Sequence, residues 1–461
     1  MKTYTFRRGI HPPTHKMSSG CPIRLVPAEG ELAYPLAQHI GVPSVPCVSV
    51  GERVLGGQRI AEAGGFVSAP LYAATSGTVK AIAPYPTVSG ETAPAIVITP
   101  DGADEWQNPA YNPKFTEPLD TASVRAGLDG ETVRAMTPDN IRRAVGDAGI
   151  VGLGGAGFPT VVKISPKEPD RIDYLIVNGA ECEPYLTSDD RLMQERADEL
   201  LGGCELLLRL FPNATCIVGV EKNKPEAIRI LTEKSTYYNR IRVASLKPKY
   251  PQGGERILIY ALTRRKLNAS MLPAAVGCIV MNVASVIAAY HAVTSGRPLT
   301  HRIVTVTGDG VAEPCNLEAP IGISYRALAK EAGGLIGVPE KLISGGPMMG
   351  TALFSLDIPV TKTSASLLAL SRDPVAEEDT SACIRCGRCL AVCPEHLQPL
   401  HLANAAERDD VEAFEHLGGM ECIECGSCAY VCPAKRHLVQ SLRYGKRKTA
   451  AAIRERSARE S

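Results

Sequence analysis

The chain has 461 residues, and at roughly 150 residues per domain this length predicts about three domains. Hydrophobic residues make up 44% and charged residues 21%, which excludes a disordered protein. The net charge of +1 and the 5% of aromatic residues argue against nucleic acid as a partner, because such a partner needs bulk positive charge or stacking surfaces. Eight of the 15 cysteines lie between Cys383 and Cys432, which excludes an evenly spread disulfide framework and predicts metal binding in a reducing cytosol.

Residues 1–100 are predicted to form a β domain, because short apolar runs alternate there with glycine turns. Two half-motifs, 47–63 and 73–84, resemble the folded-over hairpins of biotinyl and lipoyl carrier domains. Those carriers place a modifiable lysine between the halves, whereas residues 63–70 of this chain contain none. We therefore predict a carrier-like β sandwich-barrel with a structural or docking role, followed by a connector over 101–136.

Residues 137–300 are predicted to form an α/β domain. Thr137 is a suitable N-cap, and Pro138 suits the first position of a helix. Short apolar runs typical of buried parallel strands then alternate with longer runs typical of helices. The predicted strands are 174–179 and 216–220, and the predicted helices are 224–234 and 254–265.

The stretch from Leu267 to Gly296 contains no Asp, Glu, Lys or Arg, and it exceeds the ~20 residues that a membrane span requires. It also contains Pro273, Asn282 and His291, which are costly in a helix that faces lipid. A buried helix in a large core is therefore favoured over a span. If the chain works at a membrane, we expect it to do so as a peripheral protein.

The pattern changes again in the C-terminal third. Residues 301–365 indicate a small α+β unit with a hairpin, one helix and glycine turns, and the polar residues 366–382 indicate a linker. Residues 383–440 hold the cysteine runs, and residues 441–461 form a basic tail. Such a tail suits anionic lipid or an acidic partner, and a plain solvated tail is an equally open interpretation.

Two cysteine runs share the spacing Cys-x2-Cys-x2-Cys-x3-Cys-Pro, which is the pattern of bacterial ferredoxins with two clusters. In that pattern the close triplet binds one [4Fe–4S] cluster, and the fourth cysteine reaches across to the other. Two zinc sites are the alternative, but zinc requires neither the evenly spaced triplet nor the Cys-Pro pair. Two adjacent clusters predict one-electron transport. The predicted ligands are Cys383, Cys386, Cys389 and Cys432 for one cluster, and Cys422, Cys425, Cys428 and Cys393 for the second.

Residues 151–160, VGLGGAGFPT, contain a glycine-rich match at Gly152, Gly154 and Gly157. A Rossmann turn needs a strand before it, and here a helix is predicted instead. Bare backbone N–H groups still allow a phosphate or a ring to approach closely, and Lys163 follows at a spacing suited to a phosphate. For this loop alone, a structural glycine turn is the commoner explanation.

A second candidate segment follows the predicted strand 174–179, where Asn178, Glu181 and Glu183 lie at the carboxyl end of the sheet. Open α/β sheets bind their ligands at that edge. A third segment, 250–255, precedes another predicted helix. Each of these carboxylates, taken singly, is more commonly a solvated surface group.

Taken together, the segments GLGGAGFPTVVK, NGAECEPY and YPQGGE resemble the NADH- and FMN-binding fold of the flavoprotein subunit of respiratory complex I. The domain order is carrier-like, flavoprotein-like, β-grasp and twin-cluster ferredoxin, and this order resembles the RnfC subunits of Rnf electron transport complexes. The resemblance covers nearly the whole chain to about residue 440 and implies a β-grasp fold for residues 301–365.

The Rnf complexes are membrane-bound, ion-pumping oxidoreductases that link ferredoxin to NAD. The resemblance therefore implies an enzyme subunit that exchanges hydride with NAD(H) through non-covalent FMN and passes single electrons through two [4Fe–4S] clusters. It implies other subunits of a membrane redox complex as partners, including a ferredoxin-like subunit, and a peripheral position at the cytoplasmic face of the cell membrane. No catalytic residue is implied, because the cofactors carry the chemistry.

The same resemblance assigns the flavin and nucleotide contacts to three loops and one asparagine. Two departures from the complex I pattern, Ala180 in place of an acidic residue and Gly254 in place of a glutamate, affect contacts with the flavin ring. The implied cofactor-binding residues are Gly152, Gly154, Gly155, Gly157, Phe158, Lys163, Asn178, Glu181, Cys182, Glu183, Gly253, Gly254, Glu255 and Asn282.

Two other functions stay open. A soluble cobalamin reductase of the propanediol-utilisation type uses the same modules, although its flavoprotein-like motif comes first and its carrier-like domain last. An electron-wiring module keeps the clusters and lacks its own NADH site, although the intact glycine loop and Lys163 argue against it. The flavin content of the purified protein distinguishes a wiring module from a flavoprotein.

Overall fold

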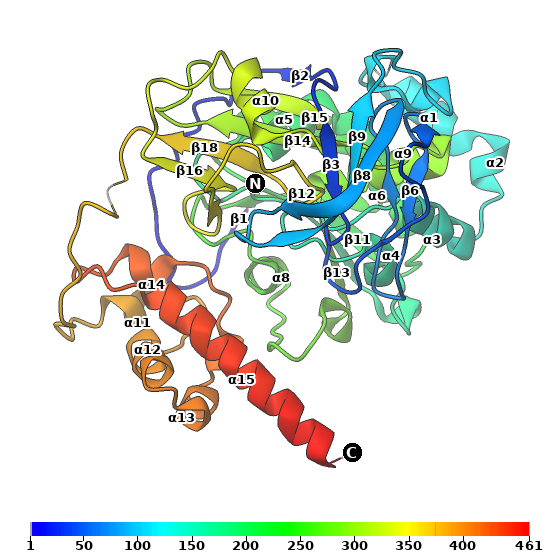
Figure 1. Cartoon of the computed structure of the whole chain (residues 1–461). Helices are drawn as coiled ribbons and strands as arrows, with labels where there is room; N and C mark the ends of the chain where they lie inside the picture. Colours follow the sequence, from blue (N-terminus) through cyan, green and yellow to red (C-terminus); the bar gives the residue numbers. More distant parts are fainter. Residues whose placement is uncertain (1, 116, 374, 461) are drawn as a thin grey trace.

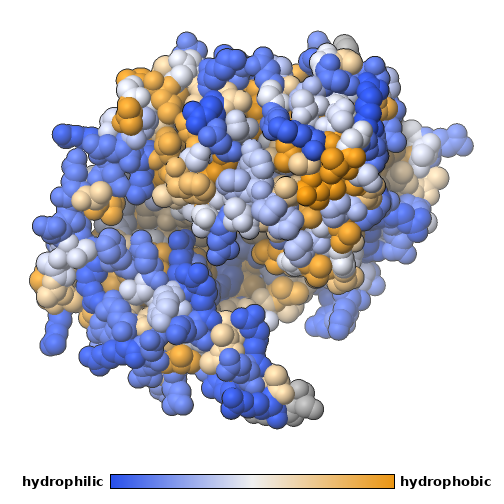
Figure 2. All heavy atoms as spheres, viewed as in Figure 1, coloured by the Kyte–Doolittle hydropathy of each residue, from blue (hydrophilic) through white to orange (hydrophobic). Residues whose placement is uncertain are grey.

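The computed structural model describes residues 2–115, 117–373 and 375–460. Residues 1, 116, 374 and 461, which belong to the predicted β domain, connector, linker and tail, lie outside the described residues. Figure 1 shows the sheets and their helices in one large body, with the C-terminal helices, orange to red, in a smaller body beside it. Hydrophilic residues cover most of the smaller body in the space-filling view from the same side (Figure 2). The predicted fold class, β and α/β parts followed by an α-rich cluster domain, is confirmed.

The N-terminal β domain consists of two small sheets that share one core. Ile60 and Val79, which come from different sheets, are fully buried in the same apolar cluster. Gly77 is required where these strands turn, because a Cβ there would lie 2.3 Å from the carbonyl oxygen of Thr99. One sheet has the order β3 (Leu32–Pro35), β9 (Thr92–Pro100), β8 (Gly77–Pro86) and β5 (Arg53–Val54), and the other has the order β4 (Val45–Pro46), β6 (Arg59–Glu62) and β7 (Leu71–Tyr72).

The first two strands of the chain do not belong to this β domain. β1 (Thr3–Tyr4) pairs in parallel with β12 (Ile241–Leu246), and β2 (Ile23–Leu25) pairs in parallel with β15 (Cys315–Pro320). Both strands lie within the predicted domain 1–100, because strands of two or three residues carry too little pattern to show which sheet they join.

The connector that follows the β domain is partly helical, with α1 (Thr121–Asp129) and α2 (Glu131–Arg134). Its indole, Trp106, packs on Gly56 of the β domain, where a Cβ would lie 2.6 Å from the ring. The same indole stacks on His301, the first residue of β14 (His301–Thr307), with the ring centroids 6.2 Å apart. The connector therefore joins the β domain to the rest of the molecule.

The α/β domain is built on five parallel strands in the order β1-β12-β11-β10-β13. Along β10, Leu175 and Val177 join one apolar cluster and Ile176 joins another, because successive side chains point to opposite faces. The strands β10 (Tyr174–Gly179), β11 (Thr215–Glu221) and β13 (Cys278–Asn282) are covered on one face by α8 (Glu255–Thr263) and on the other by α5 (Ser188–Glu195), α6 (Ala197–Leu208), α7 (Pro225–Ser235) and α9 (Val283–Ser295).

The helix that opens this domain confirms the sequence prediction. α3 (Pro138–Asp147) begins after Thr137, whose side chain accepts a hydrogen bond from the N–H of Asn140. The predicted strands and helices of residues 174–265 also form close to their expected bounds.

The charge-free stretch does not form one buried helix, and that prediction is wrong. It contains β13 and α9, which are separated at Asn282 because its side chain caps the N-terminus of α9. Nine of the residues in α9 are buried, so the absence of charge reflects packing inside the core. In the part of the chain that the structure describes, no helix is long and apolar enough to span a membrane.

The sheet of the next domain, called the third sheet, has six strands in the order β17-β16-β18-β14-β15-β2 and is accompanied by α10 (Tyr325–Glu331). β18 (Ser366–Leu370) lies inside this sheet, antiparallel to β16 and parallel to β14. The predicted linker 366–382 is therefore wrong at its start, where the apolar run SLLAL forms a buried strand. The other strands are β14 (His301–Thr307), β16 (Lys341–Ser344) and β17 (Thr351–Ala352).

The cysteine region folds as short helices packed on a long one, α15 (Leu438–Glu460). This helix begins before the predicted tail 441–461, so the tail is not a separate segment. Lys446 donates to the carbonyl of Cys422 at 2.7 Å and pairs with Glu424 at 3.1 Å. The short helices are α11 (Arg388–Val392), α12 (Pro399–Glu407), α13 (Val411–His416) and α14 (Ser427–Tyr430).

Candidate functional site

The glycine loop lies between α3 and α4 (Thr160–Lys163) at the carboxyl edge of the sheet. The N–H of Gly152 donates to the carbonyl of Phe158 at 2.8 Å, which closes the loop. Gly155 has a φ of +105° and Gly157 a φ of +65°, which L side chains rarely adopt. Residues 154–156 are exposed, and a Cβ on Gly155 would meet nothing within 4 Å. The loop therefore offers open backbone, which is what close approach of a phosphate requires.

Lys163 lies behind this loop and is held from two sides. Its ammonium donates to Glu255 Oε1 at 2.8 Å and to the carbonyl of Val280 at 3.0 Å. Glu255 is the first residue of α8, so the pair joins the glycine loop to the third predicted segment. The structure thus brings these two predicted residues together.

Asn178 is the penultimate residue of β10 and Asn282 the last residue of β13, and the two pair in register. Asn282 donates from Nδ2 to Asp189 Oδ2 at 2.7 Å, and a Cβ on Gly154 would lie 3.3 Å from its own Cβ. Asn178 donates from Nδ2 to the carbonyl of Gly253 at 2.8 Å. The asparagines therefore connect the glycine loop with the 250–255 loop.

Gly253 lies closest to the middle of the predicted site. Its N–H donates to Cys182 Sγ at 3.2 Å, and a Cβ there would be 3.3 Å from the same sulfur. Burial raises the pKa of the Cys182 thiol to about 12, so it stays protonated at neutral pH. Gly254 is the N-cap of α8 and contributes no side-chain cap.

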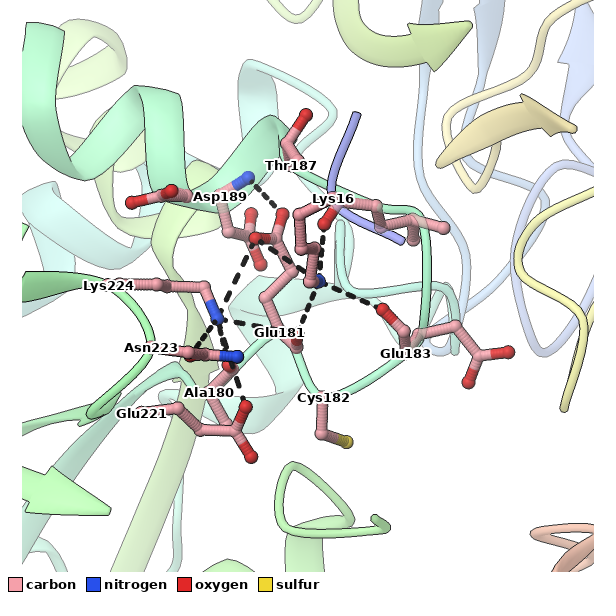
Figure 3. A network of polar contacts seen from close by, with 12 residues as sticks. Lys16, Ala180, Glu181, Cys182, Glu183, Thr187, Asp189, Glu221, Asn223 and Lys224 are labelled. Carbon is pink, nitrogen blue, oxygen red and sulfur yellow. Dashed lines mark hydrogen bonds and ion pairs between the residues drawn. The ribbon is translucent and has the colours of Figure 1, made fainter. Parts of the chain in front are cut away.

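The side chain of Glu181 is buried and lies between two lysines, as Figure 3 shows. Its Oε2 lies 3.9 Å from the ammonium of Lys16 and 4.0 Å from that of Lys224. Its Oε1 accepts the N–H of Asp189 at 2.7 Å. Burial raises the pKa of Glu181 to about 7, and the two ammonium groups oppose that rise.

Glu183 points away from Glu181 in Figure 3, toward a loop of the third sheet. Its Oε1 accepts the N–H groups of Met348 at 2.6 Å and Met349 at 3.1 Å. Gly346 is required in that loop, because a Cβ would lie 2.0 Å from the Glu183 side chain. Burial raises the pKa of Glu183 as well.

Sequence reasoning missed four residues of this region. Lys224 follows β11 in a polar turn, and a buried lysine there carries no recognisable signal. Asp189 lies near the start of α5, where an acidic residue also has a purely helical explanation. Lys16 and Met348 come from segments far away in the sequence, which no local pattern connects to the site.

The eight cysteines of the two runs line two cavities, and each cavity takes three cysteines from one run and the fourth from the other. Gly387 and Gly426 have φ values of +72° and +80°, which allow the chain to wrap tightly there. The backbone N–H of Glu424 donates to Cys422 Sγ at 3.4 Å. One cavity is lined by Cys383, Cys386, Cys389 and Cys432, and the other by Cys422, Cys425, Cys428 and Cys393.

These two sets are the predicted ones, and four thiols around one cavity fit a [4Fe–4S] cluster. The two cavities differ in exposure. Cys383 and Cys386 are exposed, whereas Cys393, Cys425 and Cys428 are buried. One cluster site is therefore near the surface and the other lies inside the molecule.

The inner cluster site abuts the candidate flavin site. The hydroxyl of Tyr250 donates to the carbonyl of Cys425 at 2.7 Å. Tyr250 and Cys425 belong to a small apolar cluster against which Cys182 and Met348 pack. Residues from the loops of the flavin site and from their supports thus reach the wall of the inner site.

Four family models match separate parts of the chain. They are the RnfC barrel sandwich hybrid domain over residues 4–103, the Nuo51 FMN-binding domain over 145–291, the SLBB domain over 303–352 and the 4Fe-4S dicluster domain over 376–433.

Relatives that match over their whole length agree with these models. A subunit of the proton-translocating ferredoxin:NAD(+) oxidoreductase complex of Clostridium ljungdahlii is 41% identical over 97% of this chain and 94% of its own length. A subunit of the Na(+)-translocating ferredoxin:NAD(+) oxidoreductase complex of Acetobacterium woodii is 40% identical over 99% of both chains. The chain belongs to the RnfC family.

Membership of the RnfC family confirms the resemblance predicted from the loops and the domain order. The FMN-binding and dicluster models confirm the predicted cofactors, a flavin and two [4Fe–4S] clusters. A solved NAD+-reducing [NiFe]-hydrogenase in the H2-reduced state matches with a TM-score of 0.50 and 20% identity, over 72% of this chain and 63% of that one. At that identity the match shows the fold alone.

The donor atoms of the flavin site also fit the cofactor. The exposed backbone at residues 154–156 leaves room for a phosphate, and Oε2 of Glu181 is buried without a hydrogen-bond partner among the described residues. Two ammonium groups lie within 4.0 Å of this oxygen, and a hydrogen-bond donor on a bound cofactor would complete its surroundings.

Proposed function

We propose that the chain is the electron-transfer subunit of a membrane-bound, ion-translocating ferredoxin:NAD oxidoreductase complex. It exchanges hydride with NAD(H) through non-covalent FMN and passes single electrons through two [4Fe–4S] clusters. The observation that carries this proposal is the contact between the flavin-domain loops and the inner cluster site at Tyr250 and Cys425. Sequence identity of 41% and 40% to two subunits of such complexes supports it.

When bound, FMN converts the two-electron chemistry of NADH into one-electron transfer to iron–sulfur clusters. The backbone of residues 152–158 would bind the phosphate of the flavin, with Lys163 behind it. Asn178, Gly253 and Cys182 would line the ring, because they meet where the two loops converge. The protein holds these groups in place by packing, since none of them needs to donate or accept a proton for the transfer.

The two cluster sites have different roles in this proposal. The inner site, lined by Cys425, would exchange electrons with the flavin, because that site adjoins the flavin loops. The outer site, lined by Cys383 and Cys386, would exchange electrons with another protein, because those cysteines are exposed. A ferredoxin-like subunit of the same complex is the partner that this exposure suits.

The subunit would bind peripherally at the cytoplasmic face of the cell membrane. The finding that the described residues contain no membrane-spanning helix supports a peripheral position. NADH-dependent reduction of the clusters in inverted vesicles, compared with sealed vesicles of the opposite orientation, tests the face. Equal activity in both would contradict the cytoplasmic assignment.

The decisive experiment is an anaerobic titration of the full chain, reconstituted with iron, sulfide and FMN. We expect about eight iron atoms per chain, as two cubane clusters require, and NADH should bleach both the flavin and the cluster absorbance. The Cys425→Ser variant is the matched control, because it removes one ligand of the inner cluster. Clusters without flavin, or flavin that NADH does not reduce, would leave only an electron-wiring module.

A further inference from the structure

An arm formed by residues 3–25 crosses three parts of the molecule. It starts as β1 on the edge of the α/β sheet and ends as β2 on the edge of the third sheet. Between these strands the arm contacts the cluster domain. Arg8 donates to the carbonyl of Leu390 at 2.8 Å, and the N–H of Gly9 donates to the carbonyl of Val392 at 2.9 Å. The arm, dark blue in Figure 1, therefore passes over the junction of the three domains.

In its middle, the arm lies on the loop that carries the site glutamates. The N–H of Tyr185 donates to the carbonyl of Thr14 at 2.8 Å, and the rings of His15 and Tyr185 stack with centroids 4.8 Å apart. The hydroxyl groups of Ser18 and Thr187 are 2.6 Å apart. These contacts hold the loop from its outer side along several residues.

Lys16 makes the central contact. Its ammonium donates to the carbonyls of Glu181 at 2.9 Å and Glu183 at 3.0 Å, and also to the carbonyl of Leu186. An ammonium group has three donors and no acceptor, so three converging carbonyls use all of them. Figure 3 shows the side chain entering the loop from the arm.

The loop needs such a support because its backbone is strained. Glu181 has a φ of +45° and Tyr185 a φ of +71°, both in the left-handed region that residues with a Cβ avoid. A strained loop keeps its shape only when surrounding contacts determine it. The contacts of Lys16 fall on Glu181 itself and on both sides of Tyr185, and its side chain is only 16% exposed.

We propose that Lys16 is a positioning residue of the FMN and NADH site, whose ammonium holds the 181–186 loop in the shape that presents its side chains to the cofactors. This inference rests on the proposed function, because it takes the loop to be part of that site. Lys16 acts through the backbone of the loop and through the carboxylate of Glu181, and it need not touch either cofactor.

The test compares Lys16→Met with Lys16→Arg in the full chain, reconstituted with iron, sulfide and FMN. We expect Lys16→Met to weaken FMN binding at least tenfold, measured by quenching of flavin fluorescence, and to raise the KM for NADH. The kcat of the fraction that carries FMN and the iron content should stay unchanged. Lys16→Arg keeps a cation with several donors and should bind FMN within about threefold of the wild type.

A matched control loosens the arm elsewhere. Lys249 donates to the carbonyl of Phe6 at 3.2 Å and lies over its ring, so Lys249→Met weakens the arm away from the loop. Equal loss of FMN in Lys249→Met, or normal FMN binding in Lys16→Met, would overturn the assignment. Lys16→Gln, which keeps hydrogen-bond donors and removes the charge, takes the place of Lys16→Met if that variant does not fold. A wild-type chain that binds no FMN would instead refute the proposed function itself.

Discussion

Lys362 allows the sharpest test of the packing behind the glycine loop. It is 1% exposed, and its ammonium donates to the carbonyls of Pro70 and Gly149, each at 2.6 Å. It therefore joins the third sheet to the β domain and to the segment that leads into the loop. Both acceptors are neutral, and burial lowers the pKa of Lys362 from 10.5 to about 7.

This shift fixes the sign of a pH effect. Between pH 7 and 10.5 the unfolded chain keeps the proton and the folded chain releases it, so the free energy of unfolding rises with pH. The slope is about 1.4 kcal/mol per pH unit, and the whole window amounts to about 5 kcal/mol. Lys362→Met removes this contribution and leaves a pH-independent loss, because the two carbonyls lose their donor.

The measurement is denaturant unfolding of both proteins at several pH values between 7.5 and 9.5, followed by the fluorescence of Trp106. That residue is the single tryptophan and lies between the β domain and the third sheet. Lys341→Met, which removes a half-exposed lysine paired with Asp373, is the matched control for the loss of a lysine that is not buried. The reasoning is refuted if the difference between wild type and Lys362→Met is flat or falls with pH.

Three further predictions concern the site and the clusters. Burial raises the pKa of Glu181 from 4.5 to about 7, so the folded state holds that proton more tightly than the unfolded state. The stability of the wild type should therefore fall relative to that of Glu181→Gln as the pH rises from 4.5 to 7, as measured by parallel thermal melts. Cys425→Ser should stop NADH from reducing the remaining cluster, whereas Cys383→Ser should leave one NADH-reducible cluster, and electron paramagnetic resonance after NADH addition distinguishes them. Gly346→Ala places a Cβ 2.0 Å from the side chain of Glu183 and should lower the stability by about 1–3 kcal/mol in the same melts. Gly20→Ala is the control and should leave the stability unchanged, because a Cβ there meets nothing within 4 Å.

The cluster ligands were the easiest part to predict from the sequence. Their spacing is local, and the crossing of the fourth cysteine follows from the repeat of the run. The structure groups the cysteines into the same two sets. The strands near 174–179 and the cap at Thr137 were predictable for the same reason, because each depends on a few neighbouring residues.

The rest of the site depends on contacts between distant residues. Lys16 meets Glu181 across 165 positions, and the same separation divides Glu183 from Met348. No periodicity or spacing links such pairs. The prediction for the charge-free stretch was wrong for another reason: a buried strand followed by a buried helix has the same composition as one longer buried helix.

The position of the arm has a consequence for how the chain is made. The arm leaves the ribosome before its pairing partners, which are residues 245–246 and 316–318, and before Val392, which it contacts in the cluster domain. At the usual speed of synthesis, roughly 20 to 80 s pass between the addition of Gly9 and the addition of Val392 to the chain. For the first part of this interval, until Leu186 has been made, the lysine that supports the site loop has no loop to support. The arm is thus made early and completes its contacts late, after the cluster domain has been made.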